Sequence, residues 1–173
     1  MSNTLALSAQ AVRNKTLTVI AAVAAALALP QLFHFAGMIS GLGAMPGAAF
    51  LPMQIPVFIA GFLAGPVVGI AAGIFSPLIS HAIVGMPSSI ILPYMMIELA
   101  GYGLIAGLLC NVKMPFIVKL LIAQIAGRAF RAAALMSFPA IWEITIIGVP
   151  GILLQWAFIP LLMYRLEGLK QKL

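Results

Sequence analysis

Long apolar runs interrupted by proline and glycine make up most of the chain. A helix needs about 20 apolar residues to cross a bilayer, and the apolar material after residue 16 is enough for about six such spans. The interruptions predict helices over about 15–34, 51–64, 66–84, 90–109, 115–138 and 141–164. We therefore expect an all-α integral membrane protein in which residues 15–173 form a single domain of six transmembrane helices, preceded by a flexible cytoplasmic N-terminus over 1–14.

Glycine and proline crowd the segment from Ala36 to Phe50, which contains four glycines, Pro46 and no charged residue. Such a segment predicts a glycine-rich first loop, or a re-entrant segment that folds over a cavity. The stretch from Gly47 to Leu109 contains six prolines, and Glu98 is its one charged residue. This pattern is typical of membrane-embedded helices that are broken at functional positions.

The composition supports the same class of protein. Of the 173 residues, 64% are apolar and 7% are charged, whereas a soluble domain has about 25% charged residues. The net charge of +6 would raise the question of nucleic-acid binding in a soluble protein. Here the basic residues mostly flank the predicted spans, as Lys and Arg do at cytoplasmic ends, so we expect no nucleic-acid partner. They include Arg13, Lys15, Lys113, Lys119, Arg165, Lys170 and Lys172.

The basic flanks also predict the orientation of the chain. With the N-terminus in the cytoplasm, six spans return the C-terminus to the same side, and every flanking positive charge then lies inside. Arg13 and Lys15, followed by an apolar run, also resemble the start of a secretory signal peptide. The run continues to about Phe35, so we expect a retained first helix in a multi-pass plasma-membrane protein with both termini in the cytoplasm.

Two of the predicted helices each carry a stripe of polar residues. The spacing of three or four residues places each set on one face of its helix. The six residues are Tyr94, Glu98 and Tyr102 in 90–109, and Gln124, Arg128 and Arg131 in 115–138. An arginine at the centre of a bilayer costs about 2.5 to 3.5 kcal/mol, so we expect both stripes to face the protein interior.

The two stripes allow two interpretations. One is an internal ion pair between an arginine and Glu98 that only fixes packing, and the other is a water-filled substrate pocket open to the outside. We favour the pocket, because two arginines face one acid before Glu143 is counted. His34, His81 and Glu143 are expected in the same outer half of the bilayer. Trp142, next to Glu143, fits either the border of a pocket or an interfacial aromatic belt.

The sequence predicts no metal, no cofactor and no catalytic site. His34 and His81 are expected near the membrane face opposite Cys110, and no closely spaced set of metal ligands occurs. A nucleophile elbow, a metalloprotease motif and a phosphate-binding Gly-Lys-Ser/Thr loop are absent from the sequence. We therefore expect a protein that is not an enzyme and does not hydrolyse ATP by itself.

Small residues one helical turn apart occur repeatedly in the first predicted helix. The pairs are Ala21 with Ala25, Ala22 with Ala26, and Ala24 with Ala28. Such pairs let another helix approach closely, although alanine is also simply a good helix former. The runs LPMQIPV at 51–57, AGFLAGP at 60–66, GMP at 85–87 and IELA at 97–100 follow the glycine-rich loop. With these features the chain resembles the substrate-binding S component of energy-coupling factor (ECF) transporters, from the first helix through the fourth.

The resemblance implies a vitamin-type micronutrient bound near the outer face under the first loop, and Gln54 joins the candidate substrate-binding residues. It also implies three protein partners within and below the lipid bilayer: one membrane scaffold subunit and two cytoplasmic ATPases. The residues that would meet the scaffold are Ala21, Ala24, Ala25 and Ala28. Cobalamin, a pyrimidine precursor and pantothenate all stay open as ligands.

Two alternatives from other classes also stay open. An intramembrane enzyme would use His81 and Glu98 as base and acid. A structural or channel subunit of the membrane would use the alanine stripe of the first helix for self-association.

Overall fold

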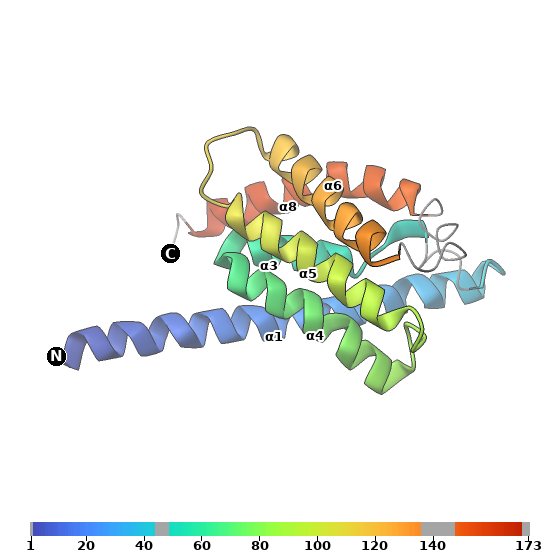
Figure 1. Ribbon diagram of the computed structural model, residues 1–173, viewed down its shortest axis with the longest axis horizontal. Helices are drawn as coiled ribbons and strands as arrows, with labels where there is room; N and C mark the ends of the chain where they lie inside the picture. Colours follow the sequence, from blue (N-terminus) through green and yellow to red (C-terminus); the bar gives the residue numbers. More distant parts are fainter. Residues whose placement is uncertain (1, 44–48, 136–147, 171–173) are drawn as a thin grey trace.

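The computed structural model describes residues 2–43, 49–135 and 148–170, and over these ranges it contains helices and no strands. The helices are α1 (Ser2–Ile39), α3 (Gln54–Ala64), α4 (Pro66–Val84), α5 (Leu92–Leu108), α6 (Phe116–Leu135) and α8 (Val149–Lys170). The predicted all-α class is therefore confirmed. In Figure 1, α1 lies along one side of the molecule, α6 and α8 lie on the opposite side, and α3, α4 and α5 lie between them.

Two described helices are long and apolar enough to cross a membrane by length and composition, α4 and the part of α1 over Ala9–Ile39. The apolar segments Gln54–Ala64, Leu92–Leu108 and Pro150–Leu166 are shorter than this criterion requires. Helix α6 has 20 residues but contains Lys119, Arg128 and Arg131. The predicted number of six membrane spans is not confirmed by these lengths and stays a prediction.

Helix boundaries agree best where proline and glycine mark them. Helix α4 begins at Pro66 and ends at Val84 as predicted, and Gly85 follows with a φ of 73°. Pro66 is well placed because the first turn of a helix needs no N–H donor, and Gly85 adopts the left-handed conformation at little cost. The start of α6 at Phe116 and the end of α5 at Leu108 also lie within one residue of prediction.

The first helix is longer than predicted at both ends. It begins at Ser2 rather than Lys15, because residues 2–14 are mostly good helix formers with no glycine or proline among them. It also continues through Pro30 to Ile39, so the prediction that the loop starts at Ala36 was wrong. The helix ends before Gly41 and Gly43, which have φ angles of 75° and 60°.

Other boundaries differ by a few residues or lie outside the described ranges. Helix α3 begins at Gln54 rather than 51, after Leu51 with its positive φ of 48°. Helix α8 continues to Lys170 rather than ending at Tyr164. The predicted end of one helix at 138 and the start of the next at 141 fall outside the described residues.

Glycines allow α4, α5 and α6 to pack with their backbones close together. A Cβ atom added to Gly69 of α4 would overlap the backbone of Gly103 of α5, and the reverse substitution would overlap equally. A Cβ atom on Gly127 of α6 would overlap the ring of Tyr102. Small residues at such crossings let helices associate where lipid supplies no hydrophobic driving force. This packing brings the polar stripe of α5 directly against that of α6.

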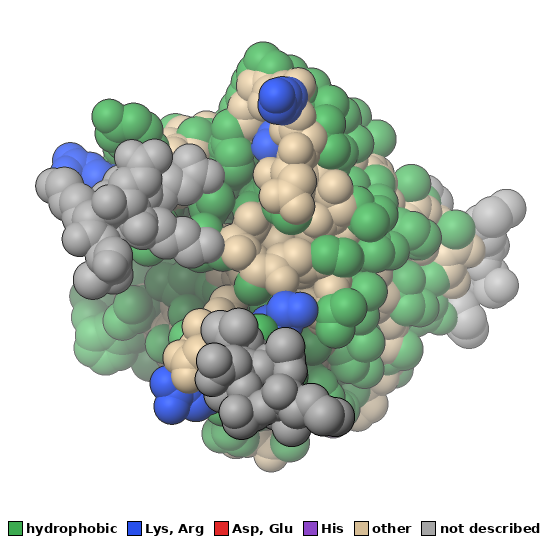
Figure 2. Space-filling view, turned by 90° about the vertical axis from the view of Figure 1, so that its left-hand side faces the viewer, with side chains coloured by type: hydrophobic (Ala, Val, Ile, Leu, Met, Phe, Trp, Pro, Cys, Tyr) green, Lys and Arg blue, Asp and Glu red, His purple; other side chains and the backbone are tan. Residues whose placement is uncertain are grey.

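The buried core lies between the helices, whereas much of the outer surface is apolar. The largest fully buried apolar or aromatic side chains are Phe58, Leu99, Tyr102, Leu120 and Ile159. Figure 2, which looks onto the left-hand end of Figure 1, shows Lys and Arg among hydrophobic and other side chains at that end of the molecule. Many large apolar side chains of the described helices are exposed, among them Ile20, Val67 and Ile125. An apolar exterior of this kind is suited to lipid contact rather than to water.

Candidate functional site

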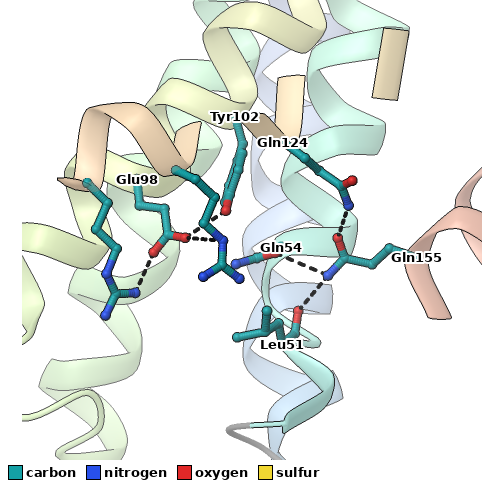
Figure 3. A network of polar contacts seen from close by, with 8 residues as sticks. Leu51, Gln54, Glu98, Tyr102, Gln124 and Gln155 are labelled. Atoms are coloured by element: carbon teal, nitrogen blue, oxygen red, sulfur yellow. Dashed lines mark hydrogen bonds and ion pairs between the residues drawn. The ribbon is translucent and has the colours of Figure 1, made fainter. Parts of the chain in front are cut away.

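A buried carboxylate on α5 lies at the centre of the candidate site. Glu98 is 1% exposed, and its Oε1 accepts a hydrogen bond of 2.6 Å from the hydroxyl of Tyr102, one turn further along α5 (Figure 3). Its Oε2 accepts a hydrogen bond of 2.6 Å from Nη1 of Arg131. The Nε atom of Arg128 lies 3.4 Å from Oε1. The two predicted stripes thus meet in one cluster of charged and hydrogen-bonded side chains.

The charges of this cluster are unequal. Within the described ranges, Glu98 contributes one negative charge against the two guanidinium groups of Arg128 and Arg131. The Nε and Nη2 atoms of Arg131 are buried and donate no hydrogen bond to any described residue. These two nitrogens form one edge of the guanidinium plane, and such an edge binds a carboxylate through two parallel hydrogen bonds. An unsatisfied buried donor is unfavourable, so this edge favours occupation by an acceptor.

A cavity of about 330 Å³ lies beside the cluster. It sits near the C-terminal ends of α1 and α4, near the N-terminal ends of α3 and α5, and against α6. Its polar or charged wall is formed by Gln31, His34, Gln54, Ser80, Ser88, Glu98, Arg128 and Arg131. The rest of the wall is apolar, from Pro30, Leu51, Pro52, Met53, Met86, Pro87, Ile91 and Met95. A mostly apolar wall with a few convergent polar groups is the usual form of a small-molecule site.

A second polar network links α8 and α6 to the cavity (Figure 3). Nε2 of Gln155 donates to Oε1 of Gln54 over 3.1 Å and lies 3.4 Å from the carbonyl oxygen of Leu51. Nε2 of Gln124 donates to Oε1 of Gln155 over 2.9 Å. The indole Nε1 of Trp156 donates to Oε1 of Gln124 over 2.6 Å. We call these four side chains, Trp156, Gln124, Gln155 and Gln54, the amide relay.

Five of the predicted binding residues line the cavity together. They are His34, Gln54, Glu98, Arg128 and Arg131. Their roles in binding stay predictions, but the geometry brings them to one place as expected. The ion pair that was the alternative interpretation is also present beside this cavity, and the substrate pocket stays a prediction.

Six other predicted residues lie elsewhere or are not described. Tyr102 supports Glu98 from a buried position, and Gln124 belongs to the amide relay. His81 is not among the cavity-lining residues, and its Nδ1 lies 2.7 Å from the carbonyl oxygen of Pro87. Tyr94 is half-buried and is also absent from the cavity wall. Trp142 and Glu143 lie outside the described residues.

Sequence reasoning did not identify Gln155, which is fully buried in α8 and connects Gln54 to Gln124. A signal was available, because Gln155 is an isolated amide within an apolar run over 149–164. Polar side chains at membrane depth almost always face the bundle interior. The role of Trp156 as a hydrogen-bond donor was also missed.

The alanine pairs of α1 divide between two environments. Ala22 and Ala26 are buried in the core, whereas Ala21, Ala24 and Ala28 are exposed and Ala25 is half-buried. An apolar groove of about 400 Å³ runs between α1 and α4 beside Ala24. Its walls are Val19, Ile20, Val23, Ala24, Leu27, Phe75 and Ile79. The alanine face expected to meet another subunit is thus mostly left uncovered by the described part of the chain.

Comparison with known proteins supplies no relative: no family model matches the chain, and neither a curated protein nor a solved structure is significantly similar to it. The site geometry is therefore the basis for a functional proposal.

Proposed function

We propose that this protein is the substrate-binding S component of an ECF-type transporter, a six-helix plasma-membrane protein that takes a vitamin-like micronutrient from outside the cell. The observation that carries the proposal is that the buried Arg131 lines a largely apolar cavity while its Nε and Nη2 atoms donate to no described residue. A cluster built only for packing gains nothing from a second guanidinium with an unsatisfied edge, because burying such a group is costly. A cluster built for an anionic ligand requires one.

The positions of the basic segments support the proposed orientation. In Figure 1, the N-terminal end of α1, the connection between α5 and α6, and the C-terminal end of α8 all lie toward the same side. These segments carry Arg13, Lys113 and Arg165, which mark a cytoplasmic face. The cavity adjoins Ile91 and Met95 at the opposite end of α5, which then faces outward. A cavity in the outer half of the bilayer suits capture of a nutrient from outside.

The cavity size and charge narrow the ligands that the resemblance left open. A volume of about 330 Å³, as the described residues enclose it, lies near the lower end of small-molecule pockets. Cobalamin is a large corrinoid and exceeds this space, and a pyrimidine precursor without a carboxylate offers no charged partner for Arg131. Pantothenate is small and carries a carboxylate. The arrangement therefore favours a small carboxylate over the other two.

The uncovered face of α1 supports the proposed partners. Ala21, Ala24 and Ala28 are exposed, and Ala24 lines the apolar groove. Close helix approach in a membrane depends on such small residues. We propose that a membrane scaffold subunit packs there and connects the protein to two cytoplasmic ATPases. Membrane lipids would cover the remaining apolar exterior.

The geometry gives less support to the intramembrane enzyme. That alternative requires His81 and Glu98 to act together as base and acid. The Glu98 carboxylate accepts from Tyr102 and Arg131, and Nδ1 of His81 contacts the carbonyl of Pro87 instead. A binding role for this cavity is the better account.

Affinity purification of the tagged protein from its native membrane tests the proposal. We expect one membrane scaffold and two ATPases to co-purify, and cells or proteoliposomes with the complete complex to take up a micronutrient only when ATP is supplied. An ATP-binding-site variant of the ATPases is the matched control and should abolish uptake. A protein that purifies without these partners, or that turns over a substrate without ATP, would contradict the proposal.

A further inference from the structure

The hydrogen bonds of the amide relay are donated in one direction, which the donor and acceptor groups at its two ends determine. An indole nitrogen can only donate a hydrogen bond, so the atom of Gln124 that faces Trp156 must be its carbonyl oxygen. The amide nitrogen of Gln124 is then left to donate to Oε1 of Gln155. This assignment follows from the donor-only character of the indole and needs no knowledge of hydrogen positions.

The same direction of donation continues from Gln155 to the cavity. With its oxygen occupied by Gln124, Gln155 presents its nitrogen to Oε1 of Gln54 and to the carbonyl oxygen of Leu51. The Leu51 carbonyl is an acceptor only, which reinforces this direction from the other side. Gln54 therefore uses its oxygen within the relay and keeps its NH₂ group for another partner. That nitrogen donates to no described residue, and Gln54 is 3% exposed and lines the cavity.

We propose that Gln54 is a specificity-determining hydrogen-bond donor, and that Trp156 is a positioning residue that holds this donor toward the substrate through Gln124 and Gln155. The inference rests on the proposed function and extends it. The substrate class is a small carboxylate whose body carries a second, neutral acceptor such as an amide or ureido carbonyl or a ring nitrogen. The carboxylate binds the edge of Arg131, and the neutral acceptor binds Nε2 of Gln54.

The location of Trp156 makes the inference testable without altering the cavity wall. Trp156 is 36% exposed, and it is not among the residues that line the cavity. Replacement by phenylalanine removes the N–H donor and keeps an aromatic ring. Only the long 3.4 Å contact between Gln155 and the Leu51 carbonyl then holds the direction of the relay. The amides of Gln124, Gln155 and Gln54 can therefore rotate by 180°, and Gln54 no longer presents a donor in every molecule.

Binding to the purified protein in detergent, measured by calorimetry, provides the first test. The probes are pantothenate, biotin and nicotinate, which combine a carboxylate with a neutral acceptor, together with pantothenol and nicotinamide, which lack the carboxylate. We expect at least one of the three carboxylates to bind and its neutral counterpart, where there is one, to bind at least about ten-fold more weakly. If none of the three carboxylates binds, or if a neutral counterpart binds equally well, the inferred substrate class is wrong.

Lipoate distinguishes the role of Gln54 from that of Arg131. Its five-carbon carboxylate chain matches that of biotin, but its dithiolane sulfurs are weak acceptors. Lipoate binding should stay the same in Trp156→Phe. Binding of the carboxylate selected in the first test should weaken by about three- to ten-fold in Gln54→Met, as expected for loss of one neutral hydrogen bond. In Trp156→Phe it should weaken by about two-fold, because the donor orientation of Gln54 is then present in about half of the molecules. Phe158→Leu, at an exposed position on α8, is the control and should change neither affinity.

The outcomes separate this inference from the function on which it rests. An equal loss of affinity for lipoate and for the selected carboxylate in Trp156→Phe would indicate a structural role and overturn the inference. Unchanged binding of both in Gln54→Met would overturn it as well, and that variant decides the matter if Trp156→Phe does not fold. Co-purification with the ATPases and ATP-dependent uptake test the proposed function independently of either result.

Discussion

Replacement of Arg131 by glutamine separates a binding arginine from a packing arginine. Arg131 donates to Glu98 over 2.6 Å with a side chain that is 9% exposed, so the substitution removes one short charged hydrogen bond. The remaining partners of Glu98 are Tyr102 at 2.6 Å and Arg128 at 3.4 Å. Because the carboxylate keeps these partners, we expect the free energy of unfolding to fall by about 1.5 to 3 kcal/mol. This loss is smaller than the roughly 3 to 5 kcal/mol that is lost when a buried charge is left without any partner.

The effect on ligand binding should be larger than the effect on folding. The Nε and Nη2 atoms of Arg131 offer two charged hydrogen bonds to a ligand carboxylate, and each is worth about 1.5 to 3 kcal/mol. Loss of even one corresponds to a decrease in affinity of about ten-fold or more. Calorimetry with the micronutrient that the wild type binds measures this change, and the thermal unfolding midpoint of the same samples reports stability.

Arg131→Lys is the matched control for this prediction. Lysine keeps a positive charge for Glu98 but has no planar edge with two parallel donors. We expect an unfolding midpoint close to that of the wild type and an affinity nearly as low as that of the glutamine variant. If both variants bind normally and only lose thermal stability, Arg131 serves packing alone, and the binding site must be sought around His34 and Gln54.

Three further predictions concern coupling, packing and orientation. Ala24→Trp should fill the apolar groove between α1 and α4, so that uptake and co-purification of the scaffold are lost while ligand affinity is retained. Phe158→Trp on α8 is the control. Lost affinity with intact assembly would contradict the assignment of this α1 face to the scaffold. Gly103→Ala should destabilise the protein by about 1 to 3 kcal/mol, because the added Cβ overlaps the Gly69 backbone, and an unchanged unfolding midpoint would show that the helices are not so closely packed. A reporter active only outside the cytoplasm should give no signal when fused to Leu173, and a strong signal would refute the predicted topology.

The sequence alone predicted the helical class, the bounds of α4 and the two polar stripes that meet at Glu98. These features depend on local properties: the period of a helix, the conformational limits of proline and glycine, and the cost of placing an arginine in lipid. Each can be read from neighbouring residues. The cost of exposing an arginine to lipid also predicted that Arg128 and Arg131 face inward, as observed. The bounds assigned to α1 were wrong at both ends, because residues 2–14 contain no glycine or proline and Gly37 did not end the helix.

Only the tertiary structure decided which polar groups share the cavity and in which direction they donate. Gln155 and Gln54 are 101 residues apart in the chain, and their contact depends on how α8 packs against α3. Helical periodicity defines the face on which a side chain lies but not the element that covers it, so His81 was expected at the site and instead contacts Pro87. Trp156 has no periodic partner either, and its control of Gln54 exists only because three helices bring four side chains into hydrogen-bonding distance.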